Sequence, residues 1–273
     1  MLKCGITGSS GTLGQNLLKK LPFHFVSFKY DITDYKKVHN WIMNNNFDLI
    51  IHLAAIVPTK EVEQNYPEAK KVNVLGTKNL VRSITKKKIR PKWIFFSSTS
   101  HVYKISDKLN FCTEKTKPNP NSKYGVTKFL AEKELKKLKK YDIKVCIGRI
   151  FSFTDKNQNP PYIIPTIIKK IRKIENKVFF KNLNHYRDFI STKQISKAIH
   201  ILQKKKASGI YNICNGRKIN LTKIAKIFAK KYKKNINLTI IEKPTYLLGN
   251  NKKLKNLGFK PKKFNNNIDY FYK

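Results

Sequence analysis

The chain has 273 residues, of which 40% are hydrophobic and 27% charged, and its formal net charge is +42. This length suits one large domain, or a larger domain with a small companion, and the hydrophobic fraction is enough to bury a sizeable core. The sequence has no apolar run of about 18 residues and no recognisable signal peptide, so we expect no membrane insertion and a cytoplasmic location. The four cysteines share no close spacing, which predicts neither disulfides nor a metal site: Cys4, Cys112, Cys146 and Cys214.

The positive charge by itself does not predict nucleic-acid binding. Only six of the 58 basic residues are arginine, and the lysines are spread along the whole chain. Nucleic-acid readers favour arginine for base edges and concentrate their charge on one face. Lysine, asparagine and isoleucine share A/T-rich codons, so genome composition explains the excess. We expect solvated surfaces and no nucleic-acid partner, although the charge can help to draw in anionic small molecules.

The first half of the chain alternates short apolar runs with helical stretches. Strands are predicted at 2–7, 24–28, 47–55, 92–98 and 143–151. Helices are predicted at 12–21, 34–46, 67–87 and from Tyr124 to about Lys140. Nearly continuous apolar strands that alternate with helices predict an α/β protein with a parallel sheet covered on both faces.

Beyond Phe151 the pattern loosens around a proline-rich loop. The elements predicted there are a helix at 165–174, a strand near 178–180, the segment 187–191, a helix to about 204, a strand at 209–215 and a helix at 221–232. This pattern predicts a smaller lobe on the carboxyl edge of the sheet. We expect a domain over 1–155, to which 186–205 returns, and a lobe built from 156–185 and 206–273.

A glycine-rich turn, ITGSSGTLG, lies between the first predicted strand and the first predicted helix. Glycines there permit a tight turn and a close approach of the backbone to a pyrophosphate at the helix N-terminus. Three glycines alone are a weak match, but the position between strand and helix is the one that the mechanism requires. This favours a dinucleotide-binding domain over an empty turn, with these binding residues: Gly8, Ser10, Gly11, Thr12, Leu13 and Gly14.

Tyr124 and Lys128 stand one helical turn apart in YGVTK, so they share a helix face. A free phenol has a pKa of ~10 and is a poor base at neutral pH. A neighbouring ammonium, or a cationic nicotinamide ring, would favour the phenolate and lower that pKa. The alternative is an ordinary surface pair, and the glycine turn upstream favours catalysis.

Several motifs in order resemble the extended short-chain dehydrogenase/reductase family: ITGSSGTLG, HLAA (52–55), VNVLGT (72–77), FFSSTSHVYK (95–104) and YGVTK (124–128). The resemblance continues through RDFIS, YNICNG and LKNLGFKP, so it covers nearly the whole chain. Members of that family are mostly NAD(P)-dependent epimerases, dehydratases and reductases of nucleotide sugars. The resemblance therefore implies a Rossmann-type doubly wound fold with a C-terminal substrate-binding lobe, a nucleotide-sugar substrate in polysaccharide precursor synthesis, NAD or NADP as cofactor, and a homodimer.

The resemblance also implies roles for individual residues. Thr99 matches a hydroxyl that hydrogen-bonds the reacting sugar oxygen, Tyr124 exchanges the proton, and Lys128 also holds the nicotinamide ribose. Arg187 matches an arginine that grips the nucleotide diphosphate, the alternative being an ion pair with Asp188. The other residues implied to bind cofactor or substrate are Leu53, Ala54, Ala55, Ser100, His101 and Ser152.

The carboxylate for the adenosine ribose is less clearly marked. Asp31 lies 23 residues after Gly8, about where a ribose-binding acid is expected. The segment DITD, with Asp31 and Ile32, also resembles a family pair that contacts adenine, which indicates that the chain has lost residues here and merged two landmarks. Lys29 could favour a 2′-phosphate, so NAD and NADP both stay open, with NAD preferred.

Three readings of the function stay open. Ser100 and His101 follow Thr99 where the 4,6-dehydratases of the family carry an acidic pair, so no dehydratase is expected. His101 matches a cysteine used by GDP-fucose synthase in epimerisation, the alternative being a histidine packed at the edge of the site. The leading hypothesis is an epimerase or oxidoreductase that works through a 4-keto sugar. A reductase resembling dTDP-4-dehydrorhamnose reductase competes with it, as does a non-catalytic NAD(P)-binding or RNA-associated protein.

Overall fold

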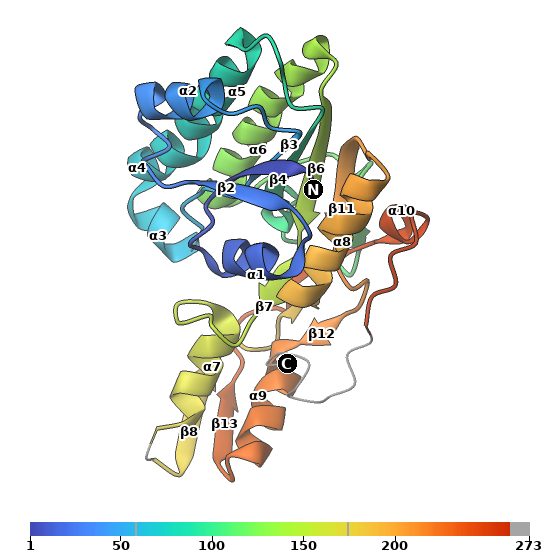
Figure 1. Cartoon of the computed structure of the whole chain (residues 1–273). Helices are drawn as coiled ribbons and strands as arrows, with labels where there is room; N and C mark the ends of the chain where they lie inside the picture. The colour runs from blue at the N-terminus through green and yellow to red at the C-terminus, as the bar shows by residue number, and fades with distance from the viewer. Residues whose placement is uncertain (58, 174, 263–273) are drawn as a thin grey trace.

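A parallel sheet of six strands forms the centre of the protein (Figure 1). The computed structural model describes residues 1–57, 59–173 and 175–262. The sheet order is β11-β6-β4-β3-β1-β2, and every neighbouring pair is parallel. Its strands are β1 (Lys3–Thr7), β2 (His24–Phe28), β3 (Leu49–His52), β4 (Trp93–Thr99), β6 (Lys144–Ile150) and β11 (Gly209–Ile213). The predicted α/β fold with a doubly wound parallel sheet is confirmed.

Helices cover both faces of this sheet because alternate side chains of each strand enter one of two separate cores. On one face lie α1 (Thr12–Lys20) and α8 (Thr192–Lys204), which pack on Ile6 and Phe95. On the other face lie α2 (Tyr35–Met43), α5 (Gly76–Lys86) and α6 (Lys123–Lys136). Each fully buried Ile, Leu or Phe contributes roughly 1.5–3 kcal/mol, so the two cores supply the main stabilisation of the sheet.

The sheet ends at β2 on the side of the glycine turn. The familiar dinucleotide-binding order, 3-2-1-4-5-6, has one more strand beyond this edge. Here the chain leaves β2 at Phe28, turns through residues 29–34 and enters α2 directly. The position of β2 at this edge of the sheet agrees with the expectation that residues are missing around Asp31.

The long helix predicted at 67–87 is interrupted. It consists of α4 (Tyr66–Lys70), a π-helical turn η1 (Lys71–Leu75) and α5. In this turn Asn73 pairs with the backbone of Ile56 in both directions: its Oδ1 accepts from Ile56 N at 2.8 Å, and its Nδ2 donates to Ile56 O at 3.0 Å. A short helix, α3 (Thr59–Gln64), lies before α4 and was not predicted.

The lobe lies beyond the carboxyl edge of the sheet, at the bottom of Figure 1. Its core packs α7 (Ile163–Ile171) and α9 (Leu221–Lys231) on the parallel pair β8 (Lys177–Lys181) and β13 (Asn235–Thr239). The remaining elements are β5 (Phe111–Cys112), β7 (Ser152–Thr154), β9 (Tyr186–Arg187), β10 (Phe189–Ser191), β12 (Ile219–Asn220), β14 (Tyr246–Gly249), α10 (Lys252–Lys255), and the 3₁₀ turns η2 (Ser100–Val102) and η3 (Lys137–Tyr141).

One expected boundary is wrong. The lobe was expected to contain all of 206–273, but β11 pairs with β6 along its whole length in the central sheet. Its residues Tyr211 and Ile213 are buried in the same core as α1 and α8. Residues 174 and 263–273, on which parts of the predicted helix and lobe fall, lie outside the described residues.

Within the described ranges, no helix combines the length and the apolar character needed to cross a bilayer. All four cysteines are buried free thiols.

Candidate active site

A cavity of about 620 Å³ opens where the carboxyl ends of the strands meet the lobe. Its walls come from the glycine turn, the segment after β3, the end of β4, α6, the start of α7, and β7 and β9. Every residue predicted for the site lines it except Asp31 and Ile32: Gly8, Ser10, Gly11, Thr12, Leu13, Gly14, Leu53, Ala54, Ala55, Thr99, Ser100, His101, Tyr124, Lys128, Ser152 and Arg187.

The glycine turn leaves open space beside its backbone, where peptide N–H groups can contact a ligand. Gly8 adopts φ 70°, and a β-carbon there would lie 2.6 Å from Ala54 N. At Gly11, by contrast, the nearest atom to an added β-carbon is Gly8 O at 3.5 Å, so a side chain would fill open space. Gly11 is also the N-cap of α1 and supplies no side-chain hydrogen bond to the first turn, whereas Ser122 caps α6. The N–H groups at the start of α1 therefore suit a phosphate.

Asp31 and Ile32 lie away from the cavity. Asp31 is exposed beyond the end of β2, and its carboxylate accepts a hydrogen bond from Thr33 N at 2.8 Å. That hydrogen bond lowers the pKa of Asp31, so the side chain carries its negative charge. Ile32 is 5% exposed and packs against Gly76 in the core beneath α5.

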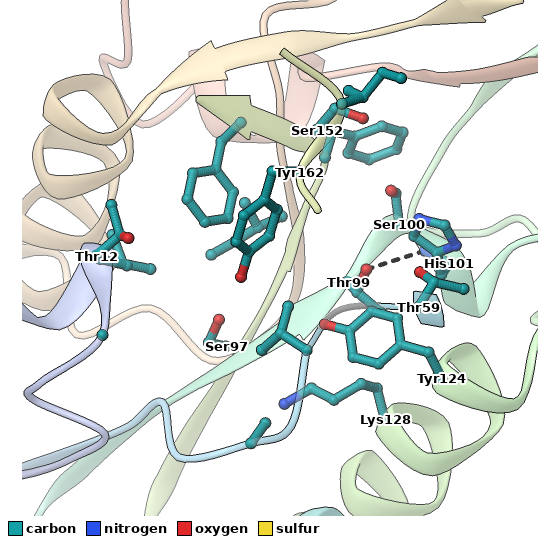
Figure 2. A pocket seen from close by; sticks show the side chains of 18 of the residues that line it. Thr12, Thr59, Ser97, Thr99, Ser100, His101, Tyr124, Lys128, Ser152 and Tyr162 are labelled. Carbon is teal, nitrogen blue, oxygen red and sulfur yellow. Dashed lines mark hydrogen bonds between the residues drawn. The ribbon is translucent and has the colours of Figure 1, made fainter. Parts of the chain in front are cut away.

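The three predicted catalytic side chains come together at one end of the cavity (Figure 2). Thr99 is the last residue of β4, and its Oγ1 accepts a hydrogen bond from His101 N at 3.2 Å. Tyr124 and Lys128 are 7% and 2% exposed on α6. Their polar ends point to the same side of the cavity as the Thr99 hydroxyl.

The charges of this group differ from the expectation. Burial raises the pKa of Tyr124, and the side-chain hydrogen bond between Thr99 and Tyr124 only partly opposes the rise. Burial also lowers the pKa of Lys128 to about 7, against the attraction of Glu132. Desolvation therefore outweighs the expected acidifying effect of the lysine, and within the protein alone Tyr124 is a neutral phenol.

His101 is neutral as well. Burial, and then the charge of Arg187, lower the pKa of His101 to about 4. Its ring meets Tyr124 edge-on, with 5.7 Å between ring centroids. Its Nδ1 atom is buried and has no hydrogen-bond partner among the described residues. The side chain thus packs at the edge of the site and keeps one unused polar atom.

Arg187 does not form the ion pair with Asp188 that was weighed as an alternative. Its Nη1 donates to the carbonyl oxygens of Tyr186 and Thr245, at 2.8 and 3.0 Å. Asp188 instead accepts backbone N–H bonds from the loop at 215–217. Burial lowers the pKa of Arg187 to about 10, so it stays cationic at neutral pH and lines the cavity.

Several lining residues were not predicted from the sequence, and Tyr162 is the most prominent. It is the N-cap of α7, and Figure 2 shows its hydroxyl directed into the cavity from the side opposite Tyr124. The ionised form of Tyr162 would raise the pKa of Tyr124, so the two phenols are electrostatically coupled. A tyrosine between Pro161 and a helix has no motif around it, so no local signal distinguished it from other loop residues. His185 and Lys60 also line the cavity and were not predicted.

Among the described residues, no group of three or more His, Cys, Asp or Glu side chains could hold a metal ion.

Two curated proteins are similar to this chain over most of its length. It is 27% identical over 226 residues to GDP-6-deoxy-D-talose 4-dehydrogenase of Aggregatibacter actinomycetemcomitans, a match that covers 79% of this chain and 75% of that protein. It is 22% identical to GDP-6-deoxy-D-mannose reductase of Pseudomonas aeruginosa, with 88% and 82% covered.

Solved structures share the fold. RMD from Pseudomonas aeruginosa complexed with NADPH superposes with a TM-score of 0.87 at 20% identity, covering 97% of this chain and 95% of that one. UDP-glucose 4-epimerase of Thermus thermophilus in complex with NAD gives a TM-score of 0.85 at 18% identity, with 99% and 97% covered. Residues 4–214 match the model of the NAD dependent epimerase/dehydratase family, which accounts for the order of the sequence motifs. The chain belongs to that family.

Proposed function

We propose that the protein is an NAD(P)-dependent enzyme that oxidises or reduces a carbon of a nucleotide-diphosphate sugar through a 4-keto sugar. The observation that carries the proposal is the meeting of Thr99, Tyr124 and Lys128 in a cavity whose far end is the uncapped start of α1. The names of the relatives support the substrate class, because they include enzymes of GDP-linked deoxysugars.

The residues present fit a dinucleotide cofactor. The first turn of α1 and the open face of Gly11 suit its pyrophosphate, and Leu53, Ala54 and Ala55 would line its path toward Lys128. Bound NAD(P) would supply the hydride acceptor or donor and, in its oxidised form, a cationic ring. Asp31 would hold an adenosine ribose if the bound cofactor reaches beyond the cavity to the end of β2.

Tyr124 is the group that we assign to proton transfer. Its hydroxyl would take the proton of a sugar hydroxyl during oxidation and return it to a keto oxygen during reduction, while Thr99 orients that oxygen. Since burial raises the pKa of Tyr124, the reaction needs positive charge close to the developing phenolate. Lys128 supplies that charge when it is protonated.

Arg187 would bind the substrate diphosphate. It is a half-buried cation in the cavity wall, and its side chain donates to backbone and hydroxyl oxygens rather than to a carboxylate. A fork of N–H donors suits phosphate oxygens in two-point contact. Ser100, His101, Ser152 and Tyr162 would surround the sugar.

A panel of UDP-, GDP- and dTDP-sugars and their 4-keto forms tests the proposal, with absorbance of the reduced nicotinamide as one readout and product stereochemistry as the other. Interconversion of epimers without net change in absorbance identifies an epimerase. Net consumption of NADPH identifies a reductase, the second candidate, which the likeness to a reductase supports. Cofactor binding with no turnover of any substrate would favour a non-catalytic NAD(P)-binding protein instead.

Further expectations belong to this proposal. The lobe would bind the nucleotide of the substrate, and the larger domain would bind the cofactor. The protein would form a homodimer through α5 and α6 and would have no nucleic-acid partner. The product would enter polysaccharide precursor synthesis in the cytoplasm. Light scattering of the purified protein tests the dimer, and a filter-binding assay with RNA at two salt concentrations tests the absence of that partner.

A further inference from the structure

Helix α6 carries a further buried polar side chain, Glu132, one turn after Lys128. Glu132 is 0% exposed, and Lys128 is 2% exposed. Side chains four residues apart on a helix are neighbours, so Lys128 stands between Tyr124 on one side and Glu132 on the other. The three residues form one column along the helix, with the lysine in its middle.

The carboxylate of Glu132 is held from two strands of the sheet. Ser98 Oγ donates to Oε1 at 2.5 Å, and Arg149 donates from Nε to Oε1 at 3.0 Å and from Nη2 to Oε2 at 2.8 Å. Ser98 and Arg149 are register partners on β4 and β6. The carboxylate is therefore fixed relative to the end of β4, where the next residue is Thr99.

The contribution of this ion pair to stability does not explain its presence. Both side chains lose their hydration, and buried ion pairs are often matched or exceeded in stability by apolar side chains of similar volume. Arg149 also lies over the ring of Tyr103, 4.8 Å from its centroid. The pair also places a negative charge, that of the Glu132 carboxylate, on the buried face of α6.

Among the described residues, the charge of Glu132 acts on Lys128 from one helical turn away. On α3, which also packs on α6, Glu63 accepts instead from Lys123 N at 2.7 Å. On β3 the titratable side chain is His52, and burial lowers its pKa to about 3, so it is neutral. From β4 Lys128 meets the ring of Phe96, with Nζ 4.2 Å from the centroid. Tyr124 is a neutral phenol and Arg149 is a cation bound to Glu132. Glu132 is the group that raises the pKa of Lys128 against the effect of burial.

We propose that Glu132 is a positioning residue for the reaction: its clamped carboxylate holds Lys128 in the ammonium form beside Tyr124. The catalytic consequence rests on the proposed function, whereas the charge state of Lys128 does not. Without Glu132, the lysine would lose its proton below neutral pH, and at pH 7 it would stabilise the phenolate less.

The first test measures the charge state without any substrate. The effect of Lys128→Met on the free energy of unfolding is measured in urea from about pH 5 to pH 9. The substitution is made in three backgrounds: wild type, Glu132→Gln, and Glu132→Gln/Arg149→Met. The double variant removes both charges of the buried pair, so it keeps the test available if the single variant leaves Arg149 unpaired and unfolds. In the wild type, the effect of Lys128→Met changes with pH above about 7, where the folded protein releases the lysine proton.

The pH at which this change begins, its onset, should fall by about one unit or more when Glu132 is replaced. Glu134→Gln is the matched control, because Glu134 lies on the same helix and pairs with Lys137 instead. The onset should not move in this control. An onset that stays in place in the double variant would overturn the proposal.

The second test uses turnover, in the direction that the substrate panel establishes. A fall of one unit in the pKa of Lys128 would leave the variant about fivefold slower than wild type near pH 7, and nearly equal to it near pH 5.5. A purely structural role for Glu132 would instead lower kcat by the same factor at both pH values. If the protein turns over no sugar, the proposed function fails while the unfolding experiment still decides the role of Glu132.

Discussion

Gly14 packs so closely against Gly8 that a β-carbon on Gly14 would lie 2.4 Å from the carbonyl oxygen of Gly8. This contact fixes the start of α1 under the turn that follows β1. Gly11, three residues earlier in the same turn, has free space where its side chain would be. Gly14 therefore serves packing, whereas we expect Gly11 to matter for cofactor binding, and substitutions can separate the two roles.

Gly14→Ala should both destabilise the protein and abolish cofactor binding, because the new methyl group meets backbone that cannot move aside. The expected loss is about 1–3 kcal/mol in the free energy of unfolding. Gly11→Ala should leave stability within about 0.5 kcal/mol of wild type and weaken NAD(P)H binding about tenfold or more, since the methyl group enters the phosphate space. Urea unfolding and fluorescence titration with NADH and NADPH measure the two effects. Equal loss of stability in both variants would contradict this division.

Tyr124→Phe should lower kcat by about 10²–10⁴-fold, the usual contribution of a positioned proton-transfer group. The ring still fills its buried space, so the thermal midpoint and the affinity for NAD(P)H should change little. Steady-state kinetics on the substrate identified by the panel supply the measurement. Thr116→Val is a suitable control, because its hydroxyl bonds to Thr113 in a turn and does not line the cavity. Turnover by Tyr124→Phe at the wild-type rate would rule out this residue as the proton carrier.

Lys128→Met should stabilise the protein while it inactivates the enzyme. A lysine in the unfolded chain titrates near 10.4, whereas burial lowers the pKa of Lys128 to about 7 in the folded protein. Between these values the unfolded chain binds one more proton, so the stability of the wild type rises with pH. The advantage of the variant, roughly 1–3 kcal/mol near pH 6, should therefore shrink toward pH 10. Urea unfolding at several pH values checks the trend, and an advantage that does not vary with pH would show that the lysine titrates normally.

Arg187→Met should weaken binding of the nucleotide sugar and leave binding of the cofactor unchanged. Loss of charged hydrogen bonds to a diphosphate costs about 1.5–3 kcal/mol, which is a rise in KM of roughly 10- to 100-fold. Because Arg187 has no ion pair with Asp188, its removal leaves no anion stranded, and the protein should stay folded. Arg172→Met serves as the control, since Arg172 is an exposed lobe arginine bonded to Tyr232. An unchanged KM in Arg187→Met would remove the diphosphate role.

The central sheet was predictable because strands buried on both faces are continuous apolar runs that a short window detects. Strand β13 was not predicted because only two of the five residues of NINLT are apolar, and its pairing with β8 links positions 58 residues apart. The π-helical turn at 71–75 has no local sequence signal, because it coincides with tertiary hydrogen bonds of Asn73 to Ile56.

The candidate site likewise has features that could be predicted from the sequence and features that could not. Gly8, Tyr124 and Lys128 belong to local motifs whose chemistry depends on spacing along the chain, and they line one cavity. The charges did not follow from the sequence, because they depend on burial. Spacing alone suggested an acidic tyrosine, whereas desolvation raises its pKa. Tyr162 reaches the cavity only through the packing of the lobe against the sheet.

The placement of β11 and α8 has a practical consequence for dissecting the protein. The polypeptide leaves the sheet after β6, builds part of the lobe, and returns to supply both an edge strand and the helix that shields α1. A fragment that ends at residue 155 would lack this cover and expose Ile6, Leu17 and Phe95 to water. We therefore expect the two regions to unfold as one cooperative unit, and we expect this fragment to aggregate rather than fold.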